Sequence, residues 1–460
     1  MNQVATTKPE IFEIWSDEII GRIDPFFYHP KFKELTKVLK KTQADPFGNI
    51  IATITNGLDY RDFEEDGITD YLRVANIKPY EIDFSDVKKV SLVSSEISKE
   101  IQLRKGDILL TRKGTYGIAV ALDRDLDAII SSEIFLIRLN RDDIDPKYIE
   151  AFLNSSIGQK QFLNQKVGAI MGSLSQDAVK SILIPLPAEA VQREVLSLIQ
   201  KAYTEKRKKE EEVEKILVSI DSFVLGELGI EISKGGTEKV FEIWSDEIQT
   251  RLDPIYLRDY SIFENLKSKY PFVTVSDVIS QPPQYGANER SIAGDPDQNI
   301  RYIRITDIDE NGELRNNDWK TAEHIEDKYF LQQDDLLFAR SGATAGKTYL
   351  YKDHDGKAIF AGYLIRFKID PKKVLPDYVF YLTKTRYYAL WKNLIQRPAG
   401  QPNINSEEFK SFRFPLPPLD AQEKITNAIK LSYSKIRTLR AQATQVLVEA
   451  QKQVEQIIFA

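Results

Sequence analysis

Basic and polar side chains on two matching turns are the residues of this sequence best suited to recognise a ligand. They follow short apolar runs, one in each half of the chain: Arg112, Lys113, Thr115 and Tyr116, and Arg340, Ser341, Thr344 and Lys347. Arginine can donate a bidentate pair of hydrogen bonds to guanine, while hydroxyl groups and backbone amides can bind phosphate. Neighbouring glycines would let a backbone approach closely. The two turns therefore favour contact with DNA.

The two arginines have an alternative role in the protein interior. Asp107 precedes Arg112, and Asp335 precedes Arg340, at the same spacing in both halves. Each arginine could therefore form a buried ion pair with its aspartate instead of contacting DNA. The spacing alone leaves both roles open.

A polar segment at 281–288 supplies further candidates, because specificity is expected in surface loops where the two halves differ most. Its candidate contact residues are Gln284, Tyr285 and Asn288. An ordinary connecting loop is the alternative. The comparable segments of the first half are 53–60 and 168–173. The lysines of the turns, Lys113 and Lys347, are expected to be exposed, where they either contact DNA or only aid solubility.

The residues that enzymes of several classes require are missing. Segment 342–348, GATAGKT, is similar to a phosphate-binding loop, but only three residues separate its glycines, where the motif needs four. We interpret it as a turn between strands. There is no Asp/Asn-Pro-Pro-Tyr/Phe tetrapeptide of amino-methyltransferases, no Gly-x-Ser-x-Gly and no His-Glu-x-x-His. With no cysteine and three scattered histidines, the sequence predicts no catalytic residue, no metal site and no cofactor.

An internal duplication organises the chain. Residues 12–25 and 241–254 are identical at 11 of 14 positions, at an offset of 229. The Pro-Leu-Pro tripeptide also recurs, at 185–187 and 415–417. A period this long indicates one fold used twice.

Each half contains the same succession of elements. Short β-branched and aromatic runs predict strands at Arg73–Ile77, Asp107–Arg112 and Ile129–Leu139, and at Tyr302–Ile308, Asp335–Arg340 and Ala358–Ile369. Helices are expected after Pro146 and Pro376, at Tyr148–Asn164 and Asp377–Gln396. The fold class is therefore mixed α/β.

A long heptad-like helix follows each Pro-Leu-Pro. Apolar or small residues recur three and four positions apart from Glu189 to about Gly226 and from Ala421 onward. We expect the two helices to pair as an antiparallel coiled-coil spacer. The predicted organisation is a globular domain at 1–187, a helix at 188–228, a second domain at 229–418 and a second helix at 419–460.

Composition sets the remaining bounds. The 460 residues carry a net charge of −6, with 42% hydrophobic and 29% charged residues. This excludes a uniformly basic surface but not a local basic cleft. We see no signal peptide, and no apolar run reaches the about 18–20 residues of a spanning helix. A cytoplasmic protein is expected.

The motifs together resemble the DNA specificity (S) subunits of type I restriction–modification systems over essentially the whole chain. They are the openings Arg22-x-Asp-Pro25 and Arg251-x-Asp-Pro254, the element Gly106-Asp-Ile-Leu-x-x-Arg112-x-Gly114, and the Pro-Leu-Pro exits with Gln192 and Gln422. Asp334 stands in the second copy where the first has Gly106.

The resemblance implies two target recognition domains, each reading one half of an asymmetric, bipartite sequence in double-stranded DNA. The helices would act as a ruler and would dock two methyltransferase subunits, which carry S-adenosylmethionine and methylate adenine. Motor-nuclease subunits, where the system also restricts DNA, would use ATP and magnesium. This chain itself would catalyse nothing. The acidic net charge is then expected on the helices and outer faces, leaving the recognition clefts positive.

Two other functions fit the residues less well. A fused restriction–methylation enzyme would need the catalytic tetrapeptide and a nuclease carboxylate–lysine cluster, which we do not find. A duplicated scaffold or carbohydrate-binding module with a coiled-coil spacer would bind a ligand other than DNA.

Overall fold

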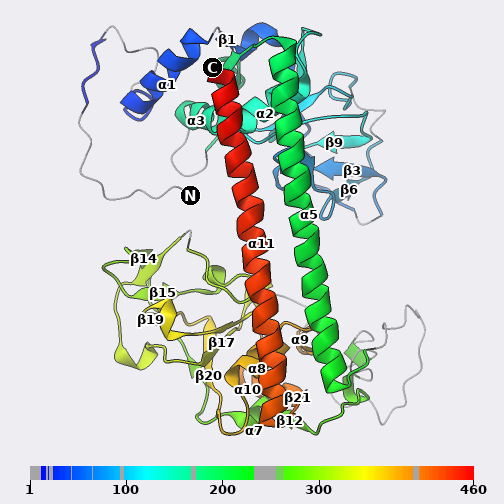
Figure 1. Ribbon diagram of the computed structural model, residues 1–460, viewed down its shortest axis with the longest axis vertical. Coiled ribbons are helices and arrows are strands. Elements are labelled where there is room, and N and C mark those ends of the chain that lie inside the picture. Colours follow the sequence, from blue (N-terminus) through cyan, green and yellow to red (C-terminus); the bar gives the residue numbers. More distant parts are fainter. Residues whose placement is uncertain are drawn as a thin grey trace. The chain divides into compact units, whose positions relative to one another are not determined.

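The computed structural model describes residues 12–459 except 17–18, 20–23, 43, 65, 94–97, 167–171, 233–255, 258–259, 261–262, 317 and 397–402. Arg22, the second opening motif at 251–254 and most of segment 168–173 therefore lie outside the described residues. The chain forms two compact units (Figure 1). Of the described residues, those at 12–210 and 440–459 belong to the first unit, and those at 211–439 belong to the second.

The first unit is built from short strands and helices. Its helices are α1 (Pro30–Lys41), α2 (Pro146–Asn154), α3 (Ser156–Gln165) and α4 (Gln176–Lys180), with parts of the long helices α5 (Glu189–Leu228) and α11 (Leu419–Phe459). Its strands are β1 (Ala44–Pro46), β2 (Ile51–Asn56), β3 (Thr69–Leu72), β4 (Ile77–Lys78), β5 (Glu81–Ile82), β6 (Lys88–Val90), β7 (Ile108–Thr111), β8 (Ala119–Ala121), β9 (Ala128–Ile130), β10 (Ile134–Leu139) and β11 (Leu183–Pro185).

The second unit repeats this plan. Its helices are α7 (Val275–Val278), α8 (Pro376–Leu382), α9 (Arg386–Ile395) and α10 (Ser406–Lys410), with the remaining parts of α5 and α11. Its strands are β12 (Phe272–Thr274), β13 (Gln284–Tyr285), β14 (Ser291–Ala293), β15 (Arg301–Ile303), β16 (Lys320–Ala322), β17 (Asp335–Ala339), β18 (Thr348–Leu350), β19 (Ala358–Phe360), β20 (Leu364–Lys368) and β21 (Arg413–Pro415).

The duplication is visible in the sheet topology. The first unit has an antiparallel sheet in the order β2-β10-β7-β8, and the second has the same arrangement as β13-β20-β17-β18. In each unit one parallel pair stands beside it, β3 with β9 and β15 with β19. The strand before each Pro-Leu-Pro also pairs alike, as β1-β11 and β12-β21. The mixed α/β class and the repeated fold are confirmed.

The strands expected at Arg73–Ile77 and Tyr302–Ile308 are wrong over most of their lengths. Residues 74–76 and 305–307 form short 3-10 helices because a side chain closes the turn. The backbone amide of Arg73 donates to Asn76 Oδ1 at 2.9 Å, and that of Arg304 donates to Asp307 Oδ2 at 2.8 Å. The strands therefore end before these turns, at Leu72 and Ile303.

The expected strands at 129–139 and 358–369 are each two strands. In the first unit the turn 131–133 separates β9 from β10, and in the second the turn 361–363 separates β19 from β20. The expected helices are broken as well. Ser155 caps α3 by accepting a hydrogen bond from the Gly158 amide, and Thr385 caps α9 in the same way from Tyr388.

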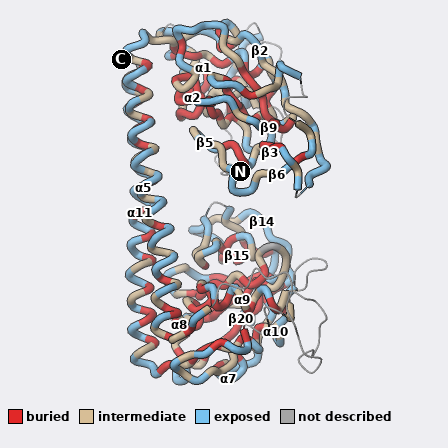
Figure 2. Tube along the Cα trace, turned by 90° about the vertical axis from the view of Figure 1, so that its right-hand side faces the viewer, coloured by how far each residue is buried: buried red, intermediate tan, exposed pale blue. Residues whose placement is uncertain are grey.

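The core of the first unit lies between its main sheet and the helices. Ile108 and Leu110 of β7 pack with Phe135 of β10 in the same cluster as Phe152 of α2. Val195 and Ile199 of α5 and Val454 of α11 extend this cluster. Figure 2 shows buried residues on the inner elements of the unit and exposed residues along the outer helix faces. The heptad pattern of the two long helices thus reflects the apolar face that each of them buries.

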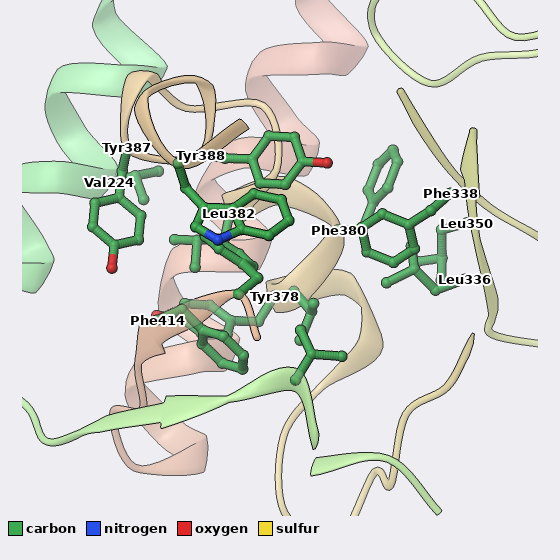
Figure 3. Close-up of a cluster of buried hydrophobic side chains, with 14 of the residues drawn as sticks. Val224, Leu336, Phe338, Leu350, Tyr378, Phe380, Leu382, Tyr387, Tyr388 and Phe414 are labelled. Carbon is green, nitrogen blue, oxygen red and sulfur yellow. The ribbon is translucent and has the colours of Figure 1, made fainter. Parts of the chain in front are cut away.

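The core of the second unit contains many aromatic side chains, some of which are drawn in Figure 3. Phe338 of β17 meets Tyr378 of α8, Tyr387 of α9 and Phe414 of β21 in one cluster with Val224 of α5. The buried hydroxyl of Tyr378 donates to the Pro415 carbonyl at 2.8 Å. Tyr148 donates to Pro185 at the same distance in the first unit. A buried tyrosine thus ties each Pro-Leu-Pro segment to its helix.

The long helices are antiparallel in each unit. In the second unit Glu212 pairs with Lys435 at 2.7 Å and Glu227 with Lys424 at 3.1 Å. Residue numbers thus fall along α11 as they rise along α5. In the first unit α5 and α11 share the apolar cluster described above. The expected antiparallel coiled coil is confirmed. Among the described residues no helix is long and apolar enough to cross a membrane.

Candidate nucleic-acid interface

Four segments that are distant in the sequence meet beside the turn after β9. We call them the first junction: residues 56–58, 112–113, 131–133 and 173–174. The Arg112 amide donates to the Glu133 carbonyl at 2.9 Å, and the Leu174 amide donates to the Arg112 carbonyl at 2.9 Å. The Ser132 amide donates to the Leu58 carbonyl at 2.8 Å. Backbone hydrogen bonds therefore fix the relative positions of all four segments.

The second unit repeats the arrangement with other side chains. Its second junction comprises residues 285–287, 340–341, 361–363 and 403–404. The corresponding bonds join Arg340 to Tyr363 at 2.9 Å, Ile404 to Arg340 at 2.7 Å and Gly362 to Ala287 at 2.7 Å, from amide to carbonyl each time. The two junctions thus share one backbone frame.

Close backbone approach explains a glycine common to both junctions. A Cβ atom at Gly57 would lie 2.0 Å from the Ile130 carbonyl oxygen. At Gly286 a Cβ atom would lie 2.3 Å from the Ala361 carbonyl oxygen and 2.4 Å from that of Phe360. These contacts are shorter than any side chain tolerates, so only glycine fits at these two positions.

Arg112 does not pair with Asp107. The Asp107 carboxylate instead accepts two hydrogen bonds from Arg138 of β10, at 2.8 and 3.1 Å. The half-buried Arg112 guanidinium lies 5.0 Å from the centre of the Phe135 ring. Its Nε has no hydrogen-bond partner among the described residues. The buried-ion-pair alternative is therefore wrong for Arg112.

Arg340 has a comparable setting. Asp335 pairs with Arg366 of β20, and Nη1 of Arg366 lies 3.2 Å from Oδ2 of Asp335. Burial raises the pKa of Asp335, and Arg366 opposes this shift. Arg340 lies over the Tyr285 ring at 5.1 Å, and its Nε donates to Asn403 Oδ1 at 3.4 Å. The buried-ion-pair alternative is therefore wrong for Arg340 as well. Both arginines remain partly exposed at the edge of their junctions.

The segment at 281–288 is only partly a loop, because Gln284 and Tyr285 form strand β13 against β20. The Gln284 side chain accepts a hydrogen bond from Arg366 and donates to the Lys328 carbonyl at 3.1 Å. It is therefore engaged within the protein. Tyr285 is 38% exposed, and Asn288 is exposed.

The lysines of the two turns differ in exposure. Lys113 is exposed as expected. The side chain of Lys347 is only 17% exposed, and its Nζ lies 2.6 Å from Glu310. The expectation that Lys347 is exposed is wrong, because it directly precedes the buried strand β18 and pairs with that carboxylate.

The remaining candidates lie on the two turns at different depths. Thr115 is exposed, whereas Tyr116 is half-buried and its ring lies 2.3 Å from where a Cβ of Gly172 would stand. Thr344 is half-buried and donates to the carbonyl of Ser341 at 3.1 Å. Ser341 itself belongs to the second junction and forms a bridge with Asn403.

Several amides of the glycine-rich segment 342–348 are engaged within the turn itself. The amide of Gly346 donates to Ala339 at 2.8 Å, and that of Lys347 donates to Thr344 at 3.0 Å. A phosphate-binding loop needs such amides directed at the ligand. The interpretation of this segment as a turn between strands is confirmed.

Sequence reasoning missed two exposed side chains of the junctions. Glu133 is exposed in the turn 131–133, and Tyr363, which is 60% exposed, occupies the same place in the turn 361–363. Both fell inside the expected continuous strands. The small residues Ser131, Ser132 and Gly362, which precede them, are the signal that could have indicated a turn.

The described residues contain no group of three or more His, Asp or Glu side chains that could hold a metal ion. The fold thus defines a duplicated α/β protein with paired long helices and two equivalent polar junctions. Residues 49–215 and 267–447 match the model of the type I restriction modification DNA specificity domain. The chain belongs to this family.

Individual relatives are distant. The chain is 22% identical over 331 residues to the type I restriction enzyme StySPI specificity subunit of Salmonella potsdam, covering 68% of this chain and 64% of the relative. It is 23% identical over 158 residues to the EcoBI specificity subunit of Escherichia coli, covering 34% and 33%. The chain therefore spans less than two thirds of either curated relative. A solved chain from a study of assembly in the type I R-M system aligns over 90% of this chain and 96% of its own, with a TM-score of 0.47 and 14% identity.

Proposed function

We propose that this chain is the DNA sequence-specificity subunit of a type I restriction–modification complex. Each junction would read one half of a bipartite target in double-stranded DNA. The observation that carries the proposal is the pair of junctions, which have the same backbone frame and different exposed side chains. A shared frame would present DNA to both units alike, whereas the different side chains would select different bases.

The exposed chemistry of the junctions suits DNA. Arg340 and Tyr285 offer a cation and an aromatic edge on one surface, and Lys113 and Thr115 offer a phosphate-binding pair on the other unit. Hydrogen bonds to phosphates position such a protein, while bidentate arginine contacts discriminate guanine. Gln284 and Lys347 are withdrawn from this surface by their internal partners.

The chain would contribute recognition, and other subunits would contribute catalysis. Two methyltransferase subunits would supply S-adenosylmethionine and methylate adenine, and motor-nuclease subunits would supply ATP- and magnesium-dependent cleavage. The outer faces of α5 and α11, which are rich in charged residues, would provide docking surfaces and set the spacing of the half-sites.

Methylome sequencing of cells with and without the gene tests this function. We expect one bipartite motif, with an unspecified gap, to lose adenine methylation when the gene is deleted and to regain it on complementation. A deletion that changes no methylated motif, together with failure to co-purify a methyltransferase, would reject the proposal and favour a scaffold with another ligand.

A further inference from the structure

The two junctions differ in charge at two equivalent positions, where Lys113 corresponds to Ser341 and Glu133 corresponds to Tyr363. Glu133 and Tyr363 are the last residues of their turns, and the backbone carbonyl of each accepts a hydrogen bond from Arg112 or Arg340. Both side chains are exposed. The side chain of Glu133 forms no hydrogen bond or ion pair with any described residue. An unpaired carboxylate thus stands beside the basic turn Arg112-Lys113 in the first junction.

A carboxylate is an unfavourable group on a surface that meets the DNA backbone, because it repels phosphates. It becomes favourable only opposite a hydrogen-bond donor of a base edge. In the major groove the cytosine N4 amino group is such a donor, and glutamate accepts from it. The adenine amino group is flanked by the N7 acceptor, which repels the second carboxylate oxygen. Guanine and thymine present acceptors at these positions.

We propose that Glu133 reads the N4 amino group of a cytosine in the half-site bound by the first unit. This inference rests on the proposed function and assigns one base of the target to one side chain. Tyr363 at the equivalent position carries no charge, and its hydroxyl can donate as well as accept, so it does not select an amino group in this way. The second half-site therefore lacks the corresponding cytosine contact.

The turn geometry makes Glu133 suitable for this role. Ser131 donates its amide to Leu72 at 2.9 Å and Ser132 donates to Leu58 at 2.8 Å, so the turn is held on both sides. The backbone of Glu133 is fixed by Arg112, as described above. Since the bond to Arg112 uses only the backbone carbonyl of residue 133, glutamine or alanine there can keep it.

The test is the methylome of cells that express the full-length chain with Glu133→Gln or Glu133→Ala in its native complex. Glutamine can bond adenine N6 and N7 together. We therefore expect Glu133→Gln to shift the preference at one base of one half-site from cytosine toward adenine, by roughly ten- to a hundredfold in the methylation ratio. Glu133→Ala should lose the cytosine preference at the same base without gaining adenine.

Asp142→Asn is the matched control, because Asp142 is an exposed acid beyond the opposite end of β10. It should leave the motif unchanged. If Glu133→Gln and Glu133→Ala also leave the motif and its methylated fraction unchanged, the inference is overturned while the bipartite motif still supports the proposed function. A change in both half-sites would overturn it as well. If deletion of the wild-type gene abolishes no motif, the proposed function itself fails.

Discussion

The guanidinium carbon of Arg340, which directly follows β17, lies 5.1 Å from the centre of the Tyr285 ring of β13. The ring holds the cation at the surface while the carboxylate of Asp335 is occupied by Arg366. A ring face uses none of the donors of the cation, so only Nε, which donates to Asn403, is engaged by a described residue. The contact therefore prepares Arg340 for a ligand instead of neutralising it.

Replacing Arg340 by alanine should weaken DNA binding by the assembled complex. The expected cost is about 1–3 kcal/mol if the arginine contacts a base, with relaxed selection at one position. If it contacts a phosphate, the logarithm of the binding constant should depend less steeply on the logarithm of the salt concentration, by roughly one unit of slope. Fluorescence anisotropy with specific and scrambled duplexes at several salt concentrations distinguishes the two.

Lys372→Ala provides the control for Arg340, because Lys372 is exposed beyond the opposite end of β20. Both variants should retain the wild-type melting temperature and co-purify with the methyltransferase. Equal binding by the two variants would contradict a role for Arg340 in DNA contact.

Local patterns could predict the strands but not their partners. The apolar run Ile108–Leu110 is fully buried, and this run with polar residues on either side was enough to predict β7. The partners of Asp107 and Asp335 could not be predicted, because Arg138 and Arg366 each follow at a separation of 31 residues. Only the register of β10 on β7, and of β20 on β17, brings the charges together.

Local patterns could likewise predict the basic turns of the candidate site, but not the residues that tertiary contacts bring to them. The turns after β7 and β17 carry basic residues that the sequence shows directly. Glu133 and Tyr363 join them only because the amides of Ser131 and Ala361 bond to strands far away in the sequence, at 2.9 Å in both units. Burial by tertiary contacts also decided that Lys347 is withdrawn, which no local pattern indicates.

Residue 286 must be glycine because the backbone of residue 361 lies against it, whereas Gly226 of the same unit has open space around it. Gly286→Ala should destabilise the protein by more than about 2 kcal/mol, since the new Cβ would meet the Ala361 carbonyl. Gly226 lies in α5 with nothing within 4 Å of a new Cβ, so Gly226→Ala should stabilise by up to about 1 kcal/mol. Urea unfolding of the full chain measures both changes. Similar effects of the two substitutions would contradict the steric argument.

Buried Glu150 should make stability depend on pH. Burial raises the pKa of Glu150 to about 7, although Lys147 and the Ala121 amide oppose the shift. The folded protein therefore binds a proton more tightly than the unfolded chain. The stability of the fold with protonated Glu150 is fully present below about pH 4.5, and it is lost progressively as the pH rises to about 7.

Glu150→Gln should remove this dependence, since the amide oxygen can still accept from Ala121, as Glu150 Oε1 does at 2.9 Å. Relative to wild type, the variant should gain stability between pH 5 and pH 8, by at most roughly 3 kcal/mol. Thermal melts across this range measure the difference. A constant difference between the two proteins at all pH values would contradict this, because it would show that the pKa of Glu150 is the same in the folded and unfolded states.

Exchange of one recognition domain tests whether the two units read DNA independently. Replacing residues 26–183 by the corresponding segment of another family member leaves α5 and α11 in place, and it exchanges the whole first junction. Because the second junction has its own backbone frame, its half-site should remain as before. The methylome should show one new half-site and one original half-site. The reciprocal exchange of the segment from β12 to β21 should give the opposite result. If either exchange altered both half-sites, recognition would be a joint property of the two units, and a model in which each junction reads its own bases would fail.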